Sequence, residues 1–367
     1  MTNFISDSQP VVIDGINLFG KLSNLIENGK VLVLTSQSVF RHPKFNFMCE
    51  ELSHLELCIE KHVKPNPTPE DIDNLFNKYQ KFEPRIIVAF GGGSVIDCGK
   101  VLKARFANRN VSSTSRLIEL DYLSQSEIML VAIPTTAGTG SEVTQFATIW
   151  TGNGAGKDSL ESLTIKPNVV LLDPDLIGSA SRQQLQNSGL DAISHCVETL
   201  WNRFKTTDSE EYAVFGLRKL LDALPNVMTG TGTKSDFENL QNGALYAGRA
   251  ISVNRTAIAH SISYPLTAYL GVPHGLACSF TIPAIYKNVY LKSSNAEHAN
   301  AILEESVIYL ESLNLAEVIL GYGTAEKIKE VGSSVSTESR SGNFKVDPSN
   351  FKIIDVLDSA LEKRLNK

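Results

Sequence analysis

GLDAISHCVE, residues 189–198, is the stretch around which this chain is organised. Its apolar pattern is typical of a buried helix, and Asp191 and His195 lie four residues apart within it. That spacing puts both side chains on one helix face, one turn apart. His260 and His274 lie in a later segment of small and apolar residues. One carboxylate and three imidazoles make a full ligand set for Fe(II) or Zn(II). The alternative is that the four are unrelated polar residues of a helical core.

The composition is that of an ordinary globular protein with room for two domains. The chain has 367 residues, of which 42% are hydrophobic and 20% are charged. Its net charge of −6 argues against a nucleic-acid partner held by bulk charge, although a local basic patch would be compatible with it. We therefore expect no nucleic-acid partner.

Neither the first residues nor the cysteines indicate export. The opening MTNFISDSQP has no basic region followed by an apolar one, and the chain has no apolar run of about 18 residues, the length that a membrane helix needs. The five cysteines are scattered and form no CxxC motif, which favours reduced thiols over a disulfide framework. We expect a cytoplasmic protein without a membrane partner.

The first half of the chain alternates short apolar runs with helical patterns. Thr68 and Pro69 are typical of the N-cap and first position of a helix between two such runs. This alternation predicts an α/β fold with a parallel sheet covered on both faces. The predicted strands are residues 31–35, 55–59, 85–90, 129–133 and 169–173.

Beyond about residue 180 the strand-like runs fade, and helix-length amphipathic patterns continue to the end. We therefore expect two domains. The first, residues 1–178, would be an α/β dinucleotide-binding domain, and the second, residues 179–367, an all-helical metal-binding domain.

Two turns rich in glycine, serine and threonine follow predicted strands. They are FGGGSVIDCGK at 90–100 and PTTAGTGSE at 134–142. Glycines let the backbone approach a ligand, and the N–H groups that begin a helix favour a phosphate. The usual GxGxxG fingerprint is absent, and a plain structural turn remains an alternative for the first motif. Together, two such turns at strand ends favour a nucleotide site.

Five motifs in order resemble the iron-containing (group III) alcohol dehydrogenases. They are GGGSVIDCGK, IPTTAGTGSEVT, LLDPDL, GLDAISHCVE and the segment from His260 to the PHG at 273–275. The resemblance runs from about residue 15 to residue 290. It implies the dehydroquinate synthase-like fold, with a nucleotide-binding α/β domain and an all-helical domain. Metal and nicotinamide would meet in the cleft between them.

The resemblance also implies roles for individual residues. Asp191, His195, His260 and His274 match the family's four metal ligands. The positions that match cofactor contacts, for NADH or NADPH, are Asn66, Gly92, Gly93, Ser94, Asp97, Thr135, Thr136, Ser141 and Lys157. Lys157 lies in a loosely matching segment, and a solvated loop lysine is an equal alternative.

Two positions depart from the family pattern. Where many members carry an aspartate that binds the adenine ribose, this chain has Ser36. Without an acid to repel a 2′-phosphate, NADP(H) is plausible beside NAD(H). Where many members have a proton-relay histidine, this chain has Tyr264, which would either donate a proton or pack; packing is the favoured interpretation.

The family resemblance predicts a metal-dependent, NAD(P)H-linked alcohol dehydrogenase or aldehyde reductase. Arg249 and Arg255 precede His260, where relatives that act on neutral alcohols tend to be apolar, so an anionic substrate group is indicated. Both arginines could instead face solvent or an interface. The run AHSISYPLT…GVPHG is most similar to the phosphonoacetaldehyde reductase (hydroxyethylphosphonate dehydrogenase) branch.

Other functions stay open at this stage. A general short-chain alcohol, 1,3-propanediol-type or glycerol dehydrogenase would share the superfamily. Glycerol dehydrogenases and dehydroquinate synthases generally use three protein ligands on zinc, so a fourth ligand favours the iron type. From another class, the chain could be a non-catalytic, nucleotide-sensing binding protein. We expect a small-molecule aldehyde or alcohol as substrate, and a homodimer or higher homo-oligomer.

Overall fold

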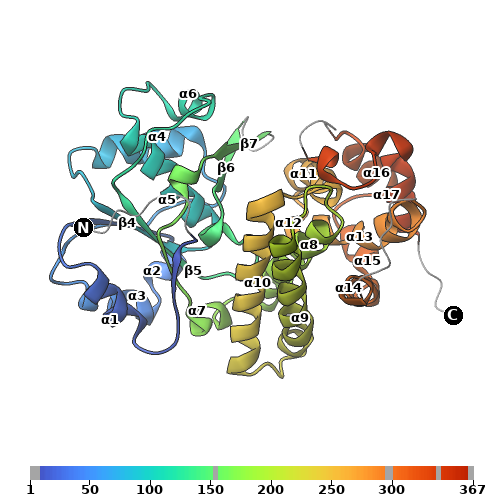
Figure 1. Cartoon of the computed structure of the whole chain (residues 1–367), viewed down its shortest axis with the longest axis horizontal. Helices are drawn as coiled ribbons and strands as arrows, with labels where there is room; N and C mark the ends of the chain where they lie inside the picture. The colour runs from blue at the N-terminus through green and yellow to red at the C-terminus, as the bar shows by residue number, and fades with distance from the viewer. Residues whose placement is uncertain (1–8, 152–155, 294–300, 336–339, 363–367) are drawn as a thin grey trace. The chain divides into compact units, whose positions relative to one another are not determined.

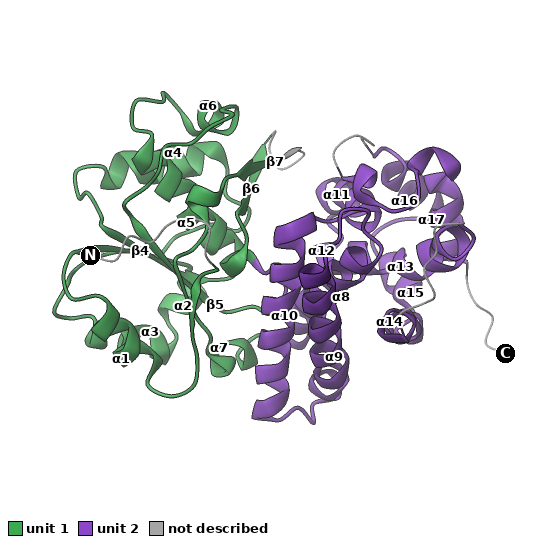
Figure 2. Cartoon of the chain, in the orientation of Figure 1, with its two compact units in different colours: residues 1–136, 141–180 green, residues 137–140, 181–367 purple. Residues whose placement is uncertain are grey.

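The computed structural model describes residues 9–151, 156–293, 301–335 and 340–362. The chain divides into two compact units (Figure 2). Unit 1 has the residues up to 136 together with 141–180, and unit 2 has 137–140 and the residues from 181 onward. The assignment of separate domains with a boundary between 178 and 179 stays a prediction.

Unit 1 is built on a six-stranded sheet in which every neighbouring pair is parallel. The strand order is β1-β8-β5-β4-β2-β3. The strands are β1 Val11–Ile13, β2 Lys30–Thr35, β3 Glu56–Glu60, β4 Ile86–Gly91, β5 Met129–Pro134 and β8 Val169–Leu171. The predicted α/β fold with a parallel sheet is therefore confirmed, and each predicted strand overlaps an observed one.

Three strands were not predicted. β1 has only three residues, too few for a pattern to show. β6, Phe146–Thr151, and β7, Gly156–Glu161, form a separate antiparallel pair.

Helices cover both faces of the sheet because side chains alternate along each strand. Leu32 and Leu34 of β2 face a core that includes α4 and α5, whereas Val31 and Val33 face a second core that includes α1 and α3. Figure 1 shows these two groups of helices on opposite sides of the sheet. The α-helices of unit 1 are α1 Leu18–Leu25, α2 Gln37–Phe40, α3 Pro43–Glu51, α4 Pro69–Tyr79, α5 Gly93–Ala107, α6 Thr114–Ile118 and α7 Pro174–Gly178.

The predicted start of α4 is confirmed in detail. The Thr68 hydroxyl accepts from the Asp71 backbone N–H at 3.2 Å, and the Asp71 carboxylate accepts from the Thr68 N–H at 3.1 Å. This reciprocal pair is a capping box, with Pro69 at the first helical position.

Within its described residues, unit 2 is built from helices. They are α8 Arg182–Leu200, α9 Thr207–Thr229, α10 Lys234–Asn254, α11 Ile258–Leu270, α12 His274–Ser279, α13 Ile282–Ile285, the π-helix Tyr286–Tyr290, α14 Ala301–Ser312, α15 Leu315–Ile319, α16 Ala325–Gly332 and α17 Ile353–Leu361. Short 3₁₀ turns occur in both units at Ser141–Val143, Leu163–Ile165, Ser341–Asn343 and Pro348–Asn350. No helix among the described residues is both long and apolar enough to cross a membrane.

Gly275 explains how α12 comes so close to α8. A Cβ at this position would stand only 1.9 Å from the Asn187 carbonyl oxygen and 2.8 Å from the Asp191 backbone nitrogen. Only glycine allows two backbones to approach this far. The contact brings His274, the neighbour of Gly275, next to Asp191 on α8.

Candidate metal centre and cofactor turns

Asp191 lies at the centre of the three histidines that the sequence singled out. Its Oδ1 atom is 3.6 Å from Nε2 of His195, 3.5 Å from Nε2 of His260 and 3.8 Å from Nε2 of His274. Two donors bound to one metal at about 2.1 Å stand about 3.4 Å apart at the tetrahedral angle. The observed spacing therefore needs to shrink by only about 0.1–0.4 Å to hold one ion.

These side chains come from three helices. Asp191 and His195 are one turn apart on α8, His260 lies in the first turn of α11, and His274 begins α12. Asp191, His195 and His260 are buried, and His274 is partly exposed. The centre is thus closed on most sides by protein.

Three buried polar atoms in this group have no hydrogen-bond partner in the described structure: Nδ1 of His195, Oδ1 of Asp191 and Nε2 of His260. The last two face each other at 3.5 Å. Leaving such atoms unsatisfied costs about 1–3 kcal/mol each. A divalent metal between Asp191 and His260 would satisfy both, so the residues fit the ion that this donor set suggests.

Glu198 contacts the ring nitrogen of His260 that faces away from Asp191. The sequence did not assign it a role. Its Oε2 atom lies 2.7 Å from Nδ1 of His260 and accepts from the Ala257 N–H at 2.8 Å, and its Oε1 accepts from the Ala259 N–H at 2.5 Å. The carboxylate is fully buried. It therefore fixes the ring of His260 and satisfies N–H groups that begin α11, where a negative charge is favourable.

The pKa shifts of Asp191 and His195 suit metal binding, but that of His260 does not. Burial alone would raise the pKa of Asp191, but the imidazoles of His195 and His260 hold that pKa below its ordinary value. Burial lowers the pKa of His195 to about 4. At neutral pH, Asp191 is a carboxylate and His195 a neutral imidazole, the forms in which both side chains bind metals. Burial alone would lower the pKa of His260, but the neighbouring Cys278 and Glu198 raise it well above its ordinary value, so metal binding must release a proton from this imidazole.

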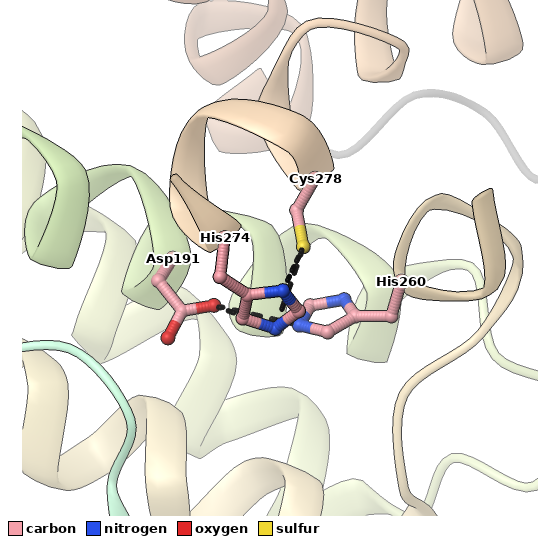
Figure 3. A group of neighbouring side chains, drawn as sticks. All are labelled: Asp191, His260, His274 and Cys278. Atoms are coloured by element: carbon pink, nitrogen blue, oxygen red, sulfur yellow. Dashed lines mark hydrogen bonds and ion pairs between the residues drawn. The ribbon is translucent and has the colours of Figure 1, made fainter. Parts of the chain in front are cut away.

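A cysteine that the sequence reasoning passed over also faces this centre (Figure 3). The donor atoms of Asp191, His260, His274 and Cys278 all lie within 4.8 Å of one another. Cys278 follows His274 by four residues on α12, so the two side chains share a helix face. The four-residue spacing of His274 and Cys278 could have indicated this in the sequence, as the same spacing did for Asp191 and His195.

Tyr264 lies beside the centre. Its ring stacks on His274, with ring centres 5.7 Å apart and an angle of 7° between planes. The guanidinium carbon of Arg340 lies 5.3 Å from the Tyr264 ring centre, and Nη1 of Arg340 donates to the Thr256 hydroxyl at 2.9 Å. The stacked ring supports the packing interpretation of Tyr264. Arg340, which sequence reasoning missed, is a half-buried cation near the centre.

The two arginines predicted to bind a substrate anion lie along and after α10. The guanidinium carbon of Arg249 is 4.9 Å from the Tyr246 ring centre. Arg255 is the C-cap that follows α10, is exposed, and its carbonyl accepts from the Asn202 side chain at 3.2 Å. Their role in binding substrate stays a prediction.

The first glycine-rich turn and the two ends of the second, residues 134–136 and 141–142, lie side by side in unit 1, whereas residues 137–140 belong to unit 2. Because β2, β4 and β5 are parallel neighbours, the residues after them emerge at one edge of the sheet. Gly92 is the N-cap of α5, and a Cβ there would be 3.4 Å from the Thr136 side chain. Gly93 begins α5, and the Thr135 N–H donates to the Gly91 carbonyl at 3.1 Å.

Hydrogen bonds tie further predicted cofactor residues to this edge. The Ser94 hydroxyl accepts from the Asn66 N–H at 3.1 Å, and the Ser141 hydroxyl donates to the Asp97 carboxylate at 2.5 Å. Ser36 follows β2, and its hydroxyl is 3.0 Å from that of Ser38. Lys157 lies in β7, and its side chain is outside the described part of the structure.

Lys100 is a buried cation that sequence reasoning gave no role. Its ammonium group donates to the Ser141 and Thr144 hydroxyls at 2.9 and 3.0 Å and to the Phe146 carbonyl at 2.6 Å. Burial lowers its pKa to about 8. Lys100 therefore holds the second turn against α5, which carries the first.

Comparison with known families matches nearly the whole chain. A family model described as iron-containing alcohol dehydrogenase matches residues 10–174. A second, described as the C-terminal part of the Fe-containing alcohol dehydrogenase family, matches residues 186–360. The resemblance inferred from the motifs is thereby confirmed.

Two relatives illustrate the range of similar sequences. A phosphonoacetaldehyde reductase from Streptomyces viridochromogenes is 31% identical over 241 residues, which cover 64% of this chain and 60% of that protein. An alcohol dehydrogenase from Thermococcus barophilus is 27% identical over 322 residues, covering 85% of this chain and 82% of that protein. The chain thus aligns with less than two thirds of the reductase.

Solved structures share the fold over almost the full length. A sulfoacetaldehyde reductase from Bifidobacterium kashiwanohense, solved with NAD+, is 20% identical with a TM-score of 0.83, covering 97% of this chain and 98% of that one. An iron-containing alcohol dehydrogenase is 24% identical with a TM-score of 0.81, covering 96% of this chain and 98% of that one. At these identities, the likeness establishes the fold alone.

Proposed function

This chain belongs to the iron-containing alcohol dehydrogenase family, and on that premise we propose that it is a metal-dependent, NAD(P)H-linked reductase of short aldehydes that carry an anionic group. Phosphonoacetaldehyde, reduced to 2-hydroxyethylphosphonate, is the substrate we favour. The observation that carries the proposal is the convergence of three imidazole nitrogens on the buried Oδ1 atom of Asp191.

The metal site has donors of the required kind already in place. When bound, a divalent metal polarises a carbonyl oxygen and the nicotinamide supplies a hydride. Asp191, His260 and His274 bind the ion, with His195 as the family's fourth ligand. Glu198 accepts the Nδ1–H of His260, which leaves the Nε2 lone pair facing Asp191.

The turns of unit 1 are suited to a dinucleotide. The free N–H groups at the start of the 15-residue α5 can bind the pyrophosphate, with Gly92 leaving room for it. Asp97 and Ser141 are fixed to each other by a hydrogen bond. Ser36 offers no charge to repel a 2′-phosphate, so we propose that NADPH is accepted as well as NADH.

Arg340 supports an anionic substrate. It is held over Tyr264, whose ring stacks on His274, so a single aromatic ring separates this positive charge from a metal ligand. The relative named phosphonoacetaldehyde reductase fits the same substrate class. We propose that Arg340 binds the anion, with Arg255 as the alternative.

Steady-state kinetics with phosphonoacetaldehyde and propanal test this proposal. A partly desolvated charge-assisted contact contributes about 1.5–3 kcal/mol, which predicts a kcat/KM about 10- to 150-fold higher for the anionic aldehyde. Arg340→Ala should erase most of that advantage and leave propanal nearly unchanged, whereas Arg255→Ala should keep it.

The possible outcomes separate the alternatives. If only Arg255→Ala removes the advantage, the anion binds at Arg255 as the sequence suggested. If the unmodified protein shows no preference, it is a general short-chain alcohol dehydrogenase. If no aldehyde supports NAD(P)H oxidation, the enzymatic function itself is wrong.

A further inference from the structure

Lys100 of α5 is a fully buried cation whose three N–H groups all find acceptors. They donate to the Ser141 hydroxyl at 2.9 Å, the Thr144 hydroxyl at 3.0 Å and the Phe146 carbonyl at 2.6 Å. An ammonium group has three donors and no acceptor. The charged form of Lys100 is therefore fully hydrogen-bonded, and all three bonds hold the segment 141–146, which begins in the second glycine-rich turn.

The charge of Lys100 also sets the direction of the Ser141 hydroxyl. Because an ammonium group only donates, the Ser141 oxygen accepts from it, and the hydroxyl hydrogen goes to Oδ1 of Asp97 at 2.5 Å. The other oxygen of Asp97 accepts from the Thr148 N–H at 2.9 Å. One chain of hydrogen bonds that starts at Lys100 thus orients Ser141 and Asp97, two of the predicted cofactor contacts.

Loss of the Lys100 proton breaks this order. A neutral amine has two N–H donors and gains a lone pair, so one of the three acceptors loses its donor. The Ser141 hydroxyl can then turn to donate to the amine, which leaves Oδ1 of Asp97 without that hydrogen bond. The arrangement of the second turn therefore depends on the protonation of Lys100.

Three charged side chains act on Lys100. Oδ1 of Asp97 lies 3.8 Å from its Nζ atom, and the buried Glu142 and Lys166 act on it from the same side of the sheet edge through their charges. Burial lowers the pKa of Lys100 to about 8, against the two carboxylates, which raise it, and with Lys166, which lowers it further. Lys100 therefore changes charge in a pH range where binding can be measured.

We propose that Lys100 is a positioning residue of the cofactor site, and that NAD(P)H binds the form of the protein in which Lys100 carries its proton. This inference rests on the proposed cofactor-dependent function, because Ser141 and Asp97 belong to the same site. Two consequences follow for the unmodified protein. Affinity for the cofactor falls as Lys100 loses its proton, and binding at alkaline pH draws a proton from solvent onto the amine.

Fluorescence titration of the metal-loaded protein with NADH at a series of pH values tests the first consequence. If only the protonated form binds, the apparent Kd rises in inverse proportion to the protonated fraction. For a pKa of about 8, that fraction falls about 25-fold between pH 7.5 and 9.5, so Kd should rise by up to that factor. Lys100→Met should bind NADH weakly throughout and show no such rise. Lys100→Arg keeps its charge over this range, so its Kd should also not rise.

Lys103→Met is the matched control. Lys103 lies three residues further along α5, is also buried, and has its pKa lowered to about 8 by burial. Its ammonium group donates to the Lys166 carbonyl at 3.3 Å and to the Asn168 side chain at 3.1 Å, not to the segment 141–146. Lys103→Met should therefore keep both the affinity for NADH and its dependence on pH.

A second measurement needs no variant and covers the case in which Lys100→Met does not fold. Calorimetric titration with NADH in two buffers of different ionisation enthalpy gives the number of protons taken up on binding. Uptake by Lys100 should reach about 0.5 proton per NADH at pH 8 and only about 0.1 at pH 7. Glu142, whose pKa is raised to about 7 by burial, would instead take up about 0.5 proton already at pH 7.

The outcomes separate this inference from the function on which it rests. Equal Kd values at pH 7.5 and 9.5 without proton uptake overturn the inference and leave the proposed function intact. A rise of Kd with pH that survives in Lys100→Met, or that disappears in Lys103→Met, also overturns it. Failure of the unmodified protein to bind NADH at any pH would overturn the proposed function itself.

Discussion

Replacing Glu198 by glutamine removes one negative charge from behind His260 and changes little else in shape. Both carboxylate oxygens accept hydrogen bonds, from Nδ1 of His260 and from the Ala257 and Ala259 N–H groups. An amide has only one acceptor oxygen, so its NH₂ group must face at least one of these donors. If that NH₂ faces Nδ1 of His260, it forces the proton onto Nε2 and blocks metal binding.

The size of the effect follows from these contacts. Loss of one charge-assisted hydrogen bond to a buried donor should lower the free energy of unfolding by about 1–3 kcal/mol. Loss of the partner that orients a ligand histidine typically lowers metal affinity about 10- to 100-fold. Glu198→Gln should therefore reduce both stability and metal affinity.

Urea unfolding of the metal-free protein and metal titration against a competing chelator measure the two effects separately. Glu60→Gln is the control, because Glu60 is also a buried carboxylate, which accepts from Lys78 at 2.6 Å and from the Tyr79 hydroxyl at 2.9 Å in unit 1. It should cost stability without changing metal affinity. Unchanged metal affinity in Glu198→Gln would refute the role of Glu198 at the centre.

Three further predictions concern other parts of the chain. Ser36→Asp should raise the KM for NADPH and leave that for NADH nearly unchanged, because only NADPH has a 2′-phosphate to repel; equal changes would show that position 36 does not face the ribose. Burial raises the pKa of Glu142 from 4.5 to about 7, so stability should fall as pH rises from 4.5 to 7, by at most about 3 kcal/mol at about 1.4 kcal/mol per pH unit. Urea unfolding at several pH values should show that Glu142→Gln abolishes this fall of stability with pH. An unchanged fall would show that Glu142 does not cause it. Gly275→Ala should lower stability by about 1–3 kcal/mol and weaken metal binding in the same titration, because its Cβ would collide with α8; an unaffected protein would show that α12 can shift at no cost.

The elements that could be predicted from the sequence are those with a local pattern. The buried strands of the parallel sheet are short continuous apolar runs, and each was located to within two residues at either end. Asp191 and His195 were paired by their spacing on one helix, and the structure confirms that helix as α8.

Glu198, Cys278 and Arg340 were missed because their contacts depend on how segments far apart in sequence pack together. Glu198 is seven residues after Asp191 on the same helix, a usable signal, but its partner is His260, sixty-two residues later. Cys278 resembles any small residue of a buried helix. Arg340 lies in a stretch rich in serine and glycine without a helical or strand-like pattern, so no local pattern points to Tyr264.

The central claim is that one divalent ion, held by Asp191, His195, His260 and His274, is needed for NAD(P)H-linked reduction of an aldehyde. The most direct measurement strips the protein of metal, adds Zn(II), Fe(II) or Co(II) in steps and follows NAD(P)H oxidation with phosphonoacetaldehyde at each step. We predict negligible turnover in the stripped protein, a rise that ends at one ion per chain, and no recovery in His274→Ala at the same metal concentrations. Full turnover without metal, or full recovery in His274→Ala, would contradict the account.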